Sequence, residues 1–120
     1  MRNVIYYNSK CSKSRTVLAI LEEKNIDIEV FEYLKDLIDI QELSFIVEKM
    51  NYDWSVIIRS KEERFKELGL SLEDAKKPEE WVKILRDNPT LLERPIVAYN
   101  DNVGICRPTE NIFAIINSKA

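Results

Sequence analysis

The chain has 120 residues, of which 45% are hydrophobic and 32% are charged, and its net charge is −3 at pH 7. This length suits one globular domain, and the acidic balance argues against a general nucleic-acid or membrane-surface binder. No apolar run approaches the roughly 18 residues of a membrane span, and the N-terminus lacks a signal-peptide pattern. We therefore expect one cytoplasmic domain over residues 1–120, with no nucleic-acid partner and no membrane partner.

The histidine and cysteine counts limit the chemistry further. The chain has no histidine, which excludes a Ser-His or Cys-His dyad and most zinc sites. Its two cysteines, Cys11 and Cys106, lie far apart in the sequence and form no disulfide framework or zinc motif. An enzyme built from this chain has to activate its nucleophile with fixed positive charge, and we expect no metal and no bound cofactor.

Cys11 lies where the first predicted strand meets the first predicted helix. Residues 4–7 are β-branched and aromatic, which favours a strand, and apolar residues at helical spacing follow the cysteine. Backbone N–H groups at a helix start stabilise a thiolate and bind anions. Lys10, Lys13 and Arg15 add positive charge nearby. The sequence therefore predicts a nucleophilic thiolate with a lowered pKa that meets an oxyanion.

A second strand and several helices are predicted next. Residues 27–33 alternate between polar and apolar, which predicts a half-buried strand, and the helical crossover favours parallel pairing with the first strand. Asp39 and Glu42 resemble a capping box at the start of a helix. A short helix is expected after Asp53, which can cap it, and another around Phe65 to Leu68, with Gly69 as its stop. A third helix is expected from Pro78 to just before Pro89, and its inner face is expected to be Trp81, Ile84 and Leu85.

The last part of the chain returns to strands. Residues 96–99 and 103–106 flank a polar turn and predict a hairpin, and Pro108 is expected to open the final helix. This order of elements predicts an α/β protein, with helices flanking a small mixed four-stranded sheet. It is the thioredoxin-like order, with an all-helical insertion at about residues 37–90 between the second and third strands.

Three segments of the chain resemble the glutaredoxin-coupled arsenate reductases. They are Cys11 at a helix start, Glu93-Arg94-Pro95-Ile96-Val97, and Cys106-Arg107-Pro108-Thr109-Glu110. Arg94-Pro95-Ile96 is shared with the Spx-type transcription regulators, whereas the third segment is narrower, because it adds an arginine that those regulators lack. The resemblance covers nearly the whole chain and includes Arg59, Asn8, Ser14 and Arg15.

The resemblance implies a mechanism for arsenic detoxification. The Cys11 thiolate attacks arsenate and forms a covalent adduct, while Arg59, Arg94 and Arg107 converge on it and bind the substrate oxyanion. Ser14 stands where a Cys-x-x-Cys motif has its second thiol, so the reductant comes from outside the chain. The family implies glutathione as co-substrate and glutaredoxin as the partner that completes the reduction to arsenite.

The supporting residues implied by the resemblance are Asn8, Ser12, Ser14, Arg15 and Pro95. Pro95 is expected to follow a cis peptide bond and to face Cys11. Ser12 stands where the family has glycine, and it keeps a hydrogen-bond donor for an oxyanion at the helix start. We expect the protein to be a monomer.

Two other functions remain open at this stage. The first is a non-enzymatic Spx-like regulator that binds RNA polymerase, although Ser14 cannot form the usual local redox switch with Cys11. The second is a monothiol glutaredoxin-like reductase of glutathione mixed disulfides, since three arginines suit an anionic peptide. Cys106 has apolar neighbours and is interpreted as a core residue, with a second-thiol role beside Cys11 as the alternative.

Overall fold

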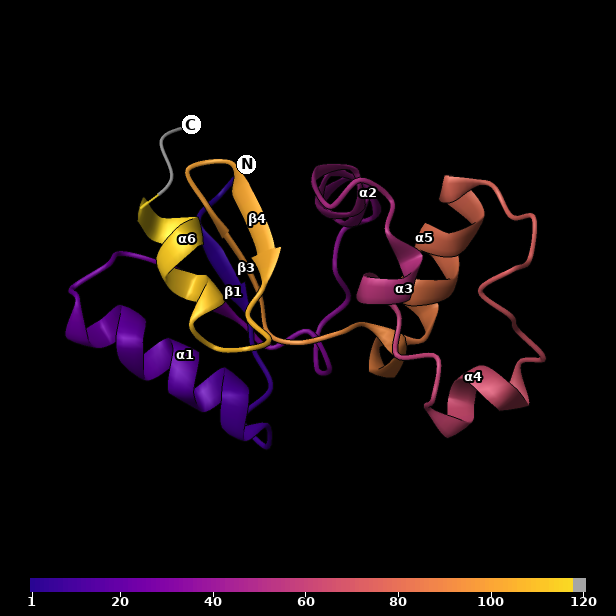
Figure 1. The fold of residues 1–120 in the computed structure, drawn as a ribbon, viewed down its shortest axis with the longest axis horizontal. Coiled ribbons are helices and arrows are strands. Elements are labelled where there is room, and N and C mark those ends of the chain that lie inside the picture. Colours follow the sequence, from indigo (N-terminus) through magenta and orange to yellow (C-terminus); the bar gives the residue numbers. More distant parts are fainter. Residues whose placement is uncertain (118–120) are drawn as a thin grey trace. The chain divides into compact units, whose positions relative to one another are not determined.

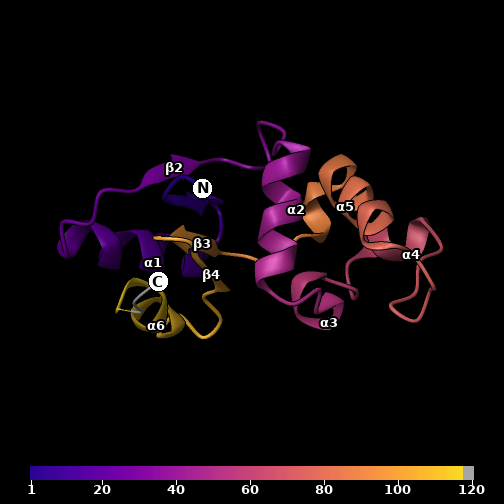
Figure 2. The ribbon, with the colours of Figure 1, turned by 90° about the horizontal axis from the view of Figure 1, so that it is seen from above.

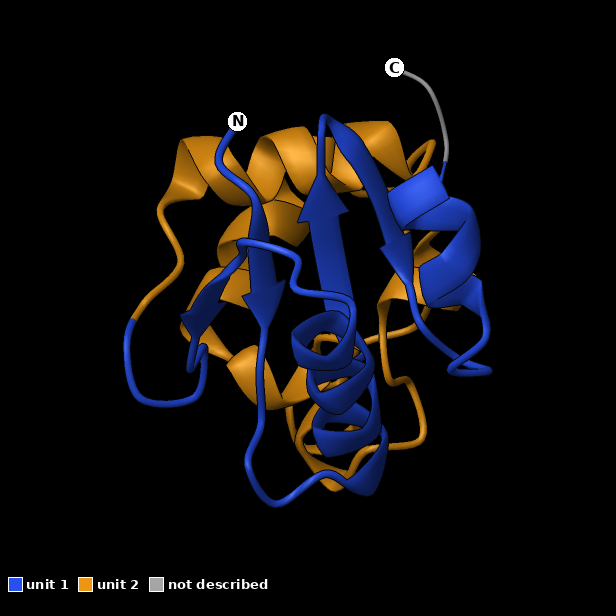
Figure 3. Ribbon diagram, turned by 90° about the vertical axis from the view of Figure 1, so that its left-hand side faces the viewer, with its two compact units in different colours: residues 1–36, 94–120 blue, residues 37–93 orange. Residues whose placement is uncertain are grey.

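The computed structural model describes residues 1–117, and the chain divides into two compact units (Figure 3). Unit 1 joins residues 1–36 to the segment that begins at Arg94, and unit 2 comprises residues 37–93. The range predicted for the helical insertion, about residues 37–90, falls in unit 2. In the described part of the chain, no helix is long and apolar enough to cross a membrane.

Unit 1 is built on a four-stranded mixed sheet in the order β2-β1-β3-β4 (Figures 1 and 2). β1 pairs in parallel with β2 and antiparallel with β3, and Ile5 lies opposite both Val30 and Val97. This pairing confirms the predicted parallel crossover and C-terminal hairpin. The strands are β1 (Val4–Tyr6), β2 (Glu29–Phe31), β3 (Ile96–Tyr99) and β4 (Asn102–Ile105).

β2 is shorter and more exposed than the alternating pattern over residues 27–33 predicts. It has three residues, and the Val30 side chain at its centre is 44% exposed. The reason is its place at the edge of the sheet, where only β1 supplies a neighbouring strand. The turn between β3 and β4 is also tighter than predicted. Asn100 and Asp101 have φ values of 49° and 65°, as a two-residue hairpin turn requires, so β4 begins at Asn102.

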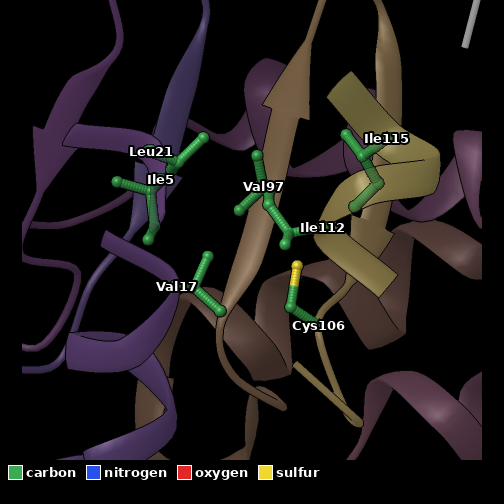
Figure 4. Close-up of a cluster of buried hydrophobic side chains, with 7 residues drawn as sticks. All are labelled: Ile5, Val17, Leu21, Val97, Cys106, Ile112 and Ile115. Carbon is green, nitrogen blue, oxygen red and sulfur yellow. The ribbon is translucent and has the colours of Figure 1, made fainter. Parts of the chain in front are cut away.

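Two helices cover one face of this sheet. They are α1 (Ser12–Glu23) and α6 (Asn111–Asn117). Side chains from both helices meet side chains from the sheet in one buried cluster (Figure 4), which consists of Ile5, Val17, Leu21, Val97, Cys106, Ile112 and Ile115. Burying this apolar surface fixes both helices against the sheet.

The prediction that Pro108 opens the final helix is wrong. α6 begins at Asn111, and residues 107–110 form a turn in which Asn111 N donates to Pro108 O at 3.1 Å and Ile112 N donates to Thr109 O at 3.1 Å. These bonds span three residues rather than the four of an α-helix, so the chain is not yet helical at Pro108. The turn holds Arg107 at its start, next to the end of β4.

Unit 2, all of whose residues are described, contains helices and one isolated bridge between Ile58 and Leu92. Its main pair of contacting helices is α2 and α5. The buried residues of α2 are Leu43, Ile46 and Val47, and those of α5 are Trp81, Val82 and Leu85. The helices are α2 (Ile40–Lys49), α3 (Trp54–Ile57), α4 (Glu63–Glu67), α5 (Pro78–Asp87) and the 3₁₀ helix η1 (Pro89–Leu91).

Most of the predicted helix ends in unit 2 are confirmed. Asp39 caps α2 by accepting from Gln41 N and Glu42 N, α5 starts at Pro78, and Gly69 has φ +67° after α4. Two details are wrong. Asp53 makes no side-chain cap for α3 and instead accepts from Ser55 Oγ at 2.5 Å, and α5 buries Val82 rather than the predicted Ile84.

Candidate active site

Cys11 is the residue that precedes α1, and its backbone is extended (φ −95°, ψ 119°). Its N–H donates to Asn8 O at 2.9 Å, and its carbonyl accepts from Arg15 N at 3.1 Å. The residue is 8% exposed. An extended residue at this position lies beside the first-turn N–H groups of the helix, which have no partner within it. The structure therefore places the thiol at the helix start, as predicted.

Two side chains hold the loop that leads into Cys11. Asn8 Oδ1 accepts from Lys10 N at 3.0 Å, which closes a tight turn before the cysteine. Arg15 Nη1 reaches back from α1 and donates to Ser9 O at 2.8 Å. The structure thus gives Asn8 and Arg15 a structural task in shaping this loop, and the loop fixes the position of the sulfur.

The pKa of the Cys11 thiol is lowered from its ordinary value. Burial is the largest single influence and raises the pKa. It is outweighed by hydrogen bonds from the Ser14 N–H, the Ser14 hydroxyl and the Lys13 N–H, together with the positive charge of Arg94. The three hydrogen bonds and the Arg94 charge stabilise the thiolate, which is the reactive form of cysteine.

Ser14 contributes more than the sequence indicates. Its side chain is fully buried, and within residues 1–117 its Oγ meets no partner at ordinary hydrogen-bond geometry. The hydroxyl is close enough to Cys11 to favour the thiolate. Sequence reasoning treated Ser14 as the replacement of a second thiol and missed this donor. Its position one helical turn after the cysteine is the signal that could have revealed it.

Arg107 and Arg94 approach Cys11 from the ends of two neighbouring strands. Arg107 Nη2 lies 3.9 Å from Cys11 Sγ, and Arg107 Nε donates to Arg94 O at 2.6 Å. The two segments meet because Ile96 of β3 pairs with Ile105 of β4. The structure therefore brings together Cys11, Arg94 and Arg107, three of the four residues predicted to act on the substrate.

Pro95 follows a cis peptide bond, which confirms that prediction, and its carbonyl accepts from Cys106 N at 2.9 Å. A second cis bond precedes Pro108 and was not predicted. Ser12 is the first residue of α1 and is exposed. Its role toward an oxyanion, and the orientation of Pro95 toward Cys11, stay predictions.

Arg59 belongs to unit 2, and its side chain makes contacts within that unit. Its Nη1 donates to Thr90 O at 3.0 Å, and its Nη2 pairs with Glu62 Oε2 at 3.1 Å. Its backbone N–H donates to Leu91 O at 2.7 Å. These contacts hold the side chain in one place within unit 2. The predicted convergence of Arg59 on Cys11 stays a prediction.

Cys106 is a core residue, as its apolar neighbours indicate. It is fully buried, and its sulfur points into the cluster formed by the sheet, α1 and α6 (Figure 4). Burial raises the pKa of its thiol to about 12. Cys106 is therefore protonated at neutral pH, and both cysteines are free thiols.

The site can also be compared with known proteins. The model of the ArsC family matches residues 6–115 of the chain. The chain belongs to the ArsC family. An arsenate reductase from Neisseria meningitidis is 39% identical over 113 residues, which cover 93% of this chain and 96% of that protein. An arsenate reductase from Haemophilus influenzae is 37% identical, covering 97% of this chain and all of that one.

A solved structure agrees with this assignment to the ArsC family. The arsenate reductase from Vibrio cholerae superposes with a TM-score of 0.84 at 35% sequence identity, over 97% of this chain and 98% of that one. The thioredoxin-like fold and the family resemblance stated from the sequence are both confirmed. Among residues 1–117 of this ArsC-family chain, no three His, Cys, Asp or Glu side chains gather into a group that could hold a metal ion.

Proposed function

We propose that this ArsC-family protein reduces arsenate to arsenite through a covalent adduct on Cys11. The observation that carries the proposal is the 3.9 Å approach of the Arg107 guanidinium to a sulfur whose pKa is lowered. Arsenate is proposed as the substrate because the relatives are named arsenate reductase. A thiolate beside a fixed guanidinium suits attack on a tetrahedral oxyanion, because the cation offsets the charge of both partners.

The binding step depends on cations. Arsenate is an anion at neutral pH, so its approach to a thiolate is unfavourable unless positive charge lies nearby. Arg107 and Arg94 provide that charge in unit 1, and a planar guanidinium presents paired donors that match the spacing of oxyanion oxygens. The N–H groups at the start of α1 are further donors for the anion. Arg59 is proposed as the third cation.

In the chemical step, Cys11 Sγ forms a bond to arsenic and one As–O bond breaks. The leaving oxygen takes a proton and departs as water. Two external thiols then supply two electrons, so that As(V) becomes As(III) and the two thiols are joined in a disulfide. Arsenite leaves, and Cys11 returns to the thiolate.

Glutathione is the proposed co-substrate, and glutaredoxin is the proposed partner that completes the reduction. Support comes from the chain's own thiols. Ser14 supplies a hydroxyl where a second thiol would stand, and the Cys106 thiol is fully buried with a raised pKa. Neither residue is suited to resolve the adduct on Cys11, so an external thiol fits the site best.

The test is arsenate-dependent consumption of NADPH, coupled through glutathione reductase, glutaredoxin and glutathione. Wild type is expected to turn over, and Cys11→Ser is expected to lose turnover while keeping its circular dichroism spectrum and melting temperature. Cys106→Ala is the matched control and should keep turnover. Activity retained in Cys11→Ser would contradict the proposal. So would an inactive wild type that is folded and whose Cys11 is readily alkylated.

A further inference from the structure

We infer that Asn111 is a positioning residue for the oxyanion site: it fixes the backbone of Arg107, and through it the guanidinium beside Cys11. The inference deepens the proposed function and rests on it for the identity of the anion. It concerns the first residue of α6, which lies outside the residues that touch the sulfur. Nothing in the sequence marks this asparagine, since asparagine is common at helix starts.

The Asn111 side chain makes two hydrogen bonds with one amide group. Its Nδ2 donates to Ile105 O at 3.1 Å and to Arg107 O at 3.2 Å. These carbonyls lie on either side of Cys106, at the point where β4 ends and the turn into α6 begins. The amide therefore links the last residue of β4 to Arg107, two residues later, and fixes the backbone of Arg107 relative to the end of the strand.

The other carbonyls of this turn are satisfied by the backbone of α6. Pro108 O accepts from Asn111 N, Thr109 O accepts from Ile112 N, and Glu110 O accepts from Phe113 N, each at 3.1 Å. Ile105 O and Arg107 O accept from the Asn111 side chain. The Ile105 carbonyl is part-buried and the Arg107 carbonyl is exposed, so one side chain binds two carbonyls at the junction between β4 and the turn.

From this anchor, the contacts lead to the sulfur in two steps. The backbone of Arg107 is held by Asn111, and its side chain is held by the bond from Nε to Arg94 O at 2.6 Å. With both ends fixed, Nη2 remains at 3.9 Å from Cys11 Sγ. A long side chain with a loosened backbone samples other positions, and each one removes positive charge from the thiolate.

The experiment is a double-mutant cycle between Asn111→Ala and Arg107→Ala. The first readout is the pH profile of Cys11 alkylation by iodoacetamide, measured in the Cys106→Ala background without arsenate. The second is KM for arsenate in the coupled assay. Asn111→Ala alone is expected to shift the alkylation profile to higher pH and to raise KM about three- to tenfold, the effect of losing one or two neutral hydrogen bonds.

The decisive comparison is the same substitution in a chain that already lacks Arg107. There, Asn111→Ala is expected to leave the alkylation profile unchanged, because the group it positions is gone. An equal shift in both backgrounds would overturn the inference, since it would mean a general loosening of the fold. No shift in either background would also overturn it.

Two further variants keep the result clear. Asn117→Ala makes the same change at the exposed last residue of α6 and should leave both readouts as in wild type. If Asn111→Ala melts too early for measurement, Asn111→Ser replaces it, since serine suits a helix start but is too short to reach both carbonyls. The alkylation profile uses no arsenate. A protein inactive toward arsenate that still shows the predicted cycle would thus refute the substrate and leave the positioning role intact.

Discussion

Arg107 Nε donates to the main-chain carbonyl of Arg94 at 2.6 Å, so the two arginines that approach Cys11 in unit 1 are joined through the backbone of one of them. This bond uses one edge of the Arg107 guanidinium and leaves Nη2 near Cys11 Sγ. A rigid planar group can make both contacts at once, whereas an ammonium group on a flexible stem cannot. The planar geometry of the Arg107 guanidinium, with its fork of N–H donors, therefore matters here in addition to its positive charge.

Arg107→Lys tests this point, because it keeps the charge and removes the fork. We expect KM for arsenate to rise about tenfold or more, which corresponds to the loss of a charge-assisted hydrogen bond of about 1.5–3 kcal/mol. Steady-state kinetics in the coupled assay measures the change. Arg86→Lys, a surface arginine of unit 2 that pairs with Asp87, is the matched control. A wild-type KM in Arg107→Lys would show that charge alone suffices.

Ser14→Ala is expected to raise the pKa of Cys11 without loss of stability. The hydroxyl favours the thiolate, but as a buried group with no partner at ordinary hydrogen-bond geometry it costs desolvation in the folded protein. Removing it should move the alkylation profile to higher pH while the melting temperature stays the same or rises. Ser44→Ala, on the exposed side of α2, serves as the control. A profile that does not move would exclude Ser14 as a donor to Cys11.

The raised pKa of the Cys106 thiol predicts a loss of stability at alkaline pH. Its thiol has a pKa of about 12 in the folded protein, against about 8.5 in an unfolded chain. Between these values the folded state binds one more proton than the unfolded state, so this contribution is fully present below about pH 8.5 and falls as pH rises, by up to about 1.4 kcal/mol per unit.

Urea unfolding of wild type and Cys106→Ala from pH 7 to 11 measures this dependence. The variant is expected to be less stable at neutral pH by about 1 kcal/mol, since a core side chain is shortened. Its stability should then fall less steeply with pH than that of wild type. Parallel curves for the two proteins would mean that burial of this thiol does not hold its proton.

Arg59→Ala is expected to raise KM for arsenate if this side chain is the third cation of the site. Within unit 2 its guanidinium is held by Thr90 O and Glu62, so its loss should have only a small effect on stability. Arg64→Ala is the matched control, since Arg64 makes a similar pair with Glu67 in the same unit. Equal kinetics for both variants would remove Arg59 from the proposed site.

Local patterns were sufficient to predict most of the elements of this chain. The strand before Cys11, the cap at Asp39, the start of α5 at Pro78 and the left-handed stop at Gly69 each depend on the chemistry of a few adjacent residues. The same is true of the hairpin. Where local signals competed, prediction was wrong: Pro108 was expected to open a helix, but it lies in a turn that precedes Asn111.

The candidate site could be predicted only in part, for the same reason. Cys11 was identified because its helix start and basic neighbours are adjacent in sequence. Ser14 and Asn111 were missed as donors, because their roles depend on where a hydroxyl and an amide point after packing. Neither direction is encoded in spacing alone.

By itself, the sequence determined the order of strands and helices and the family, and it predicted Cys11 as the nucleophile. These follow from short-range chemistry: periodicity, helix ends, and a thiol among cations. Only the tertiary structure decided that Arg94 and Arg107 lie near Cys11, since residues 94 and 107 meet residue 11 through pairing of β1, β3 and β4. Distances across a sheet arise from long-range pairing, and a charge or a donor changes a pKa only at short distance.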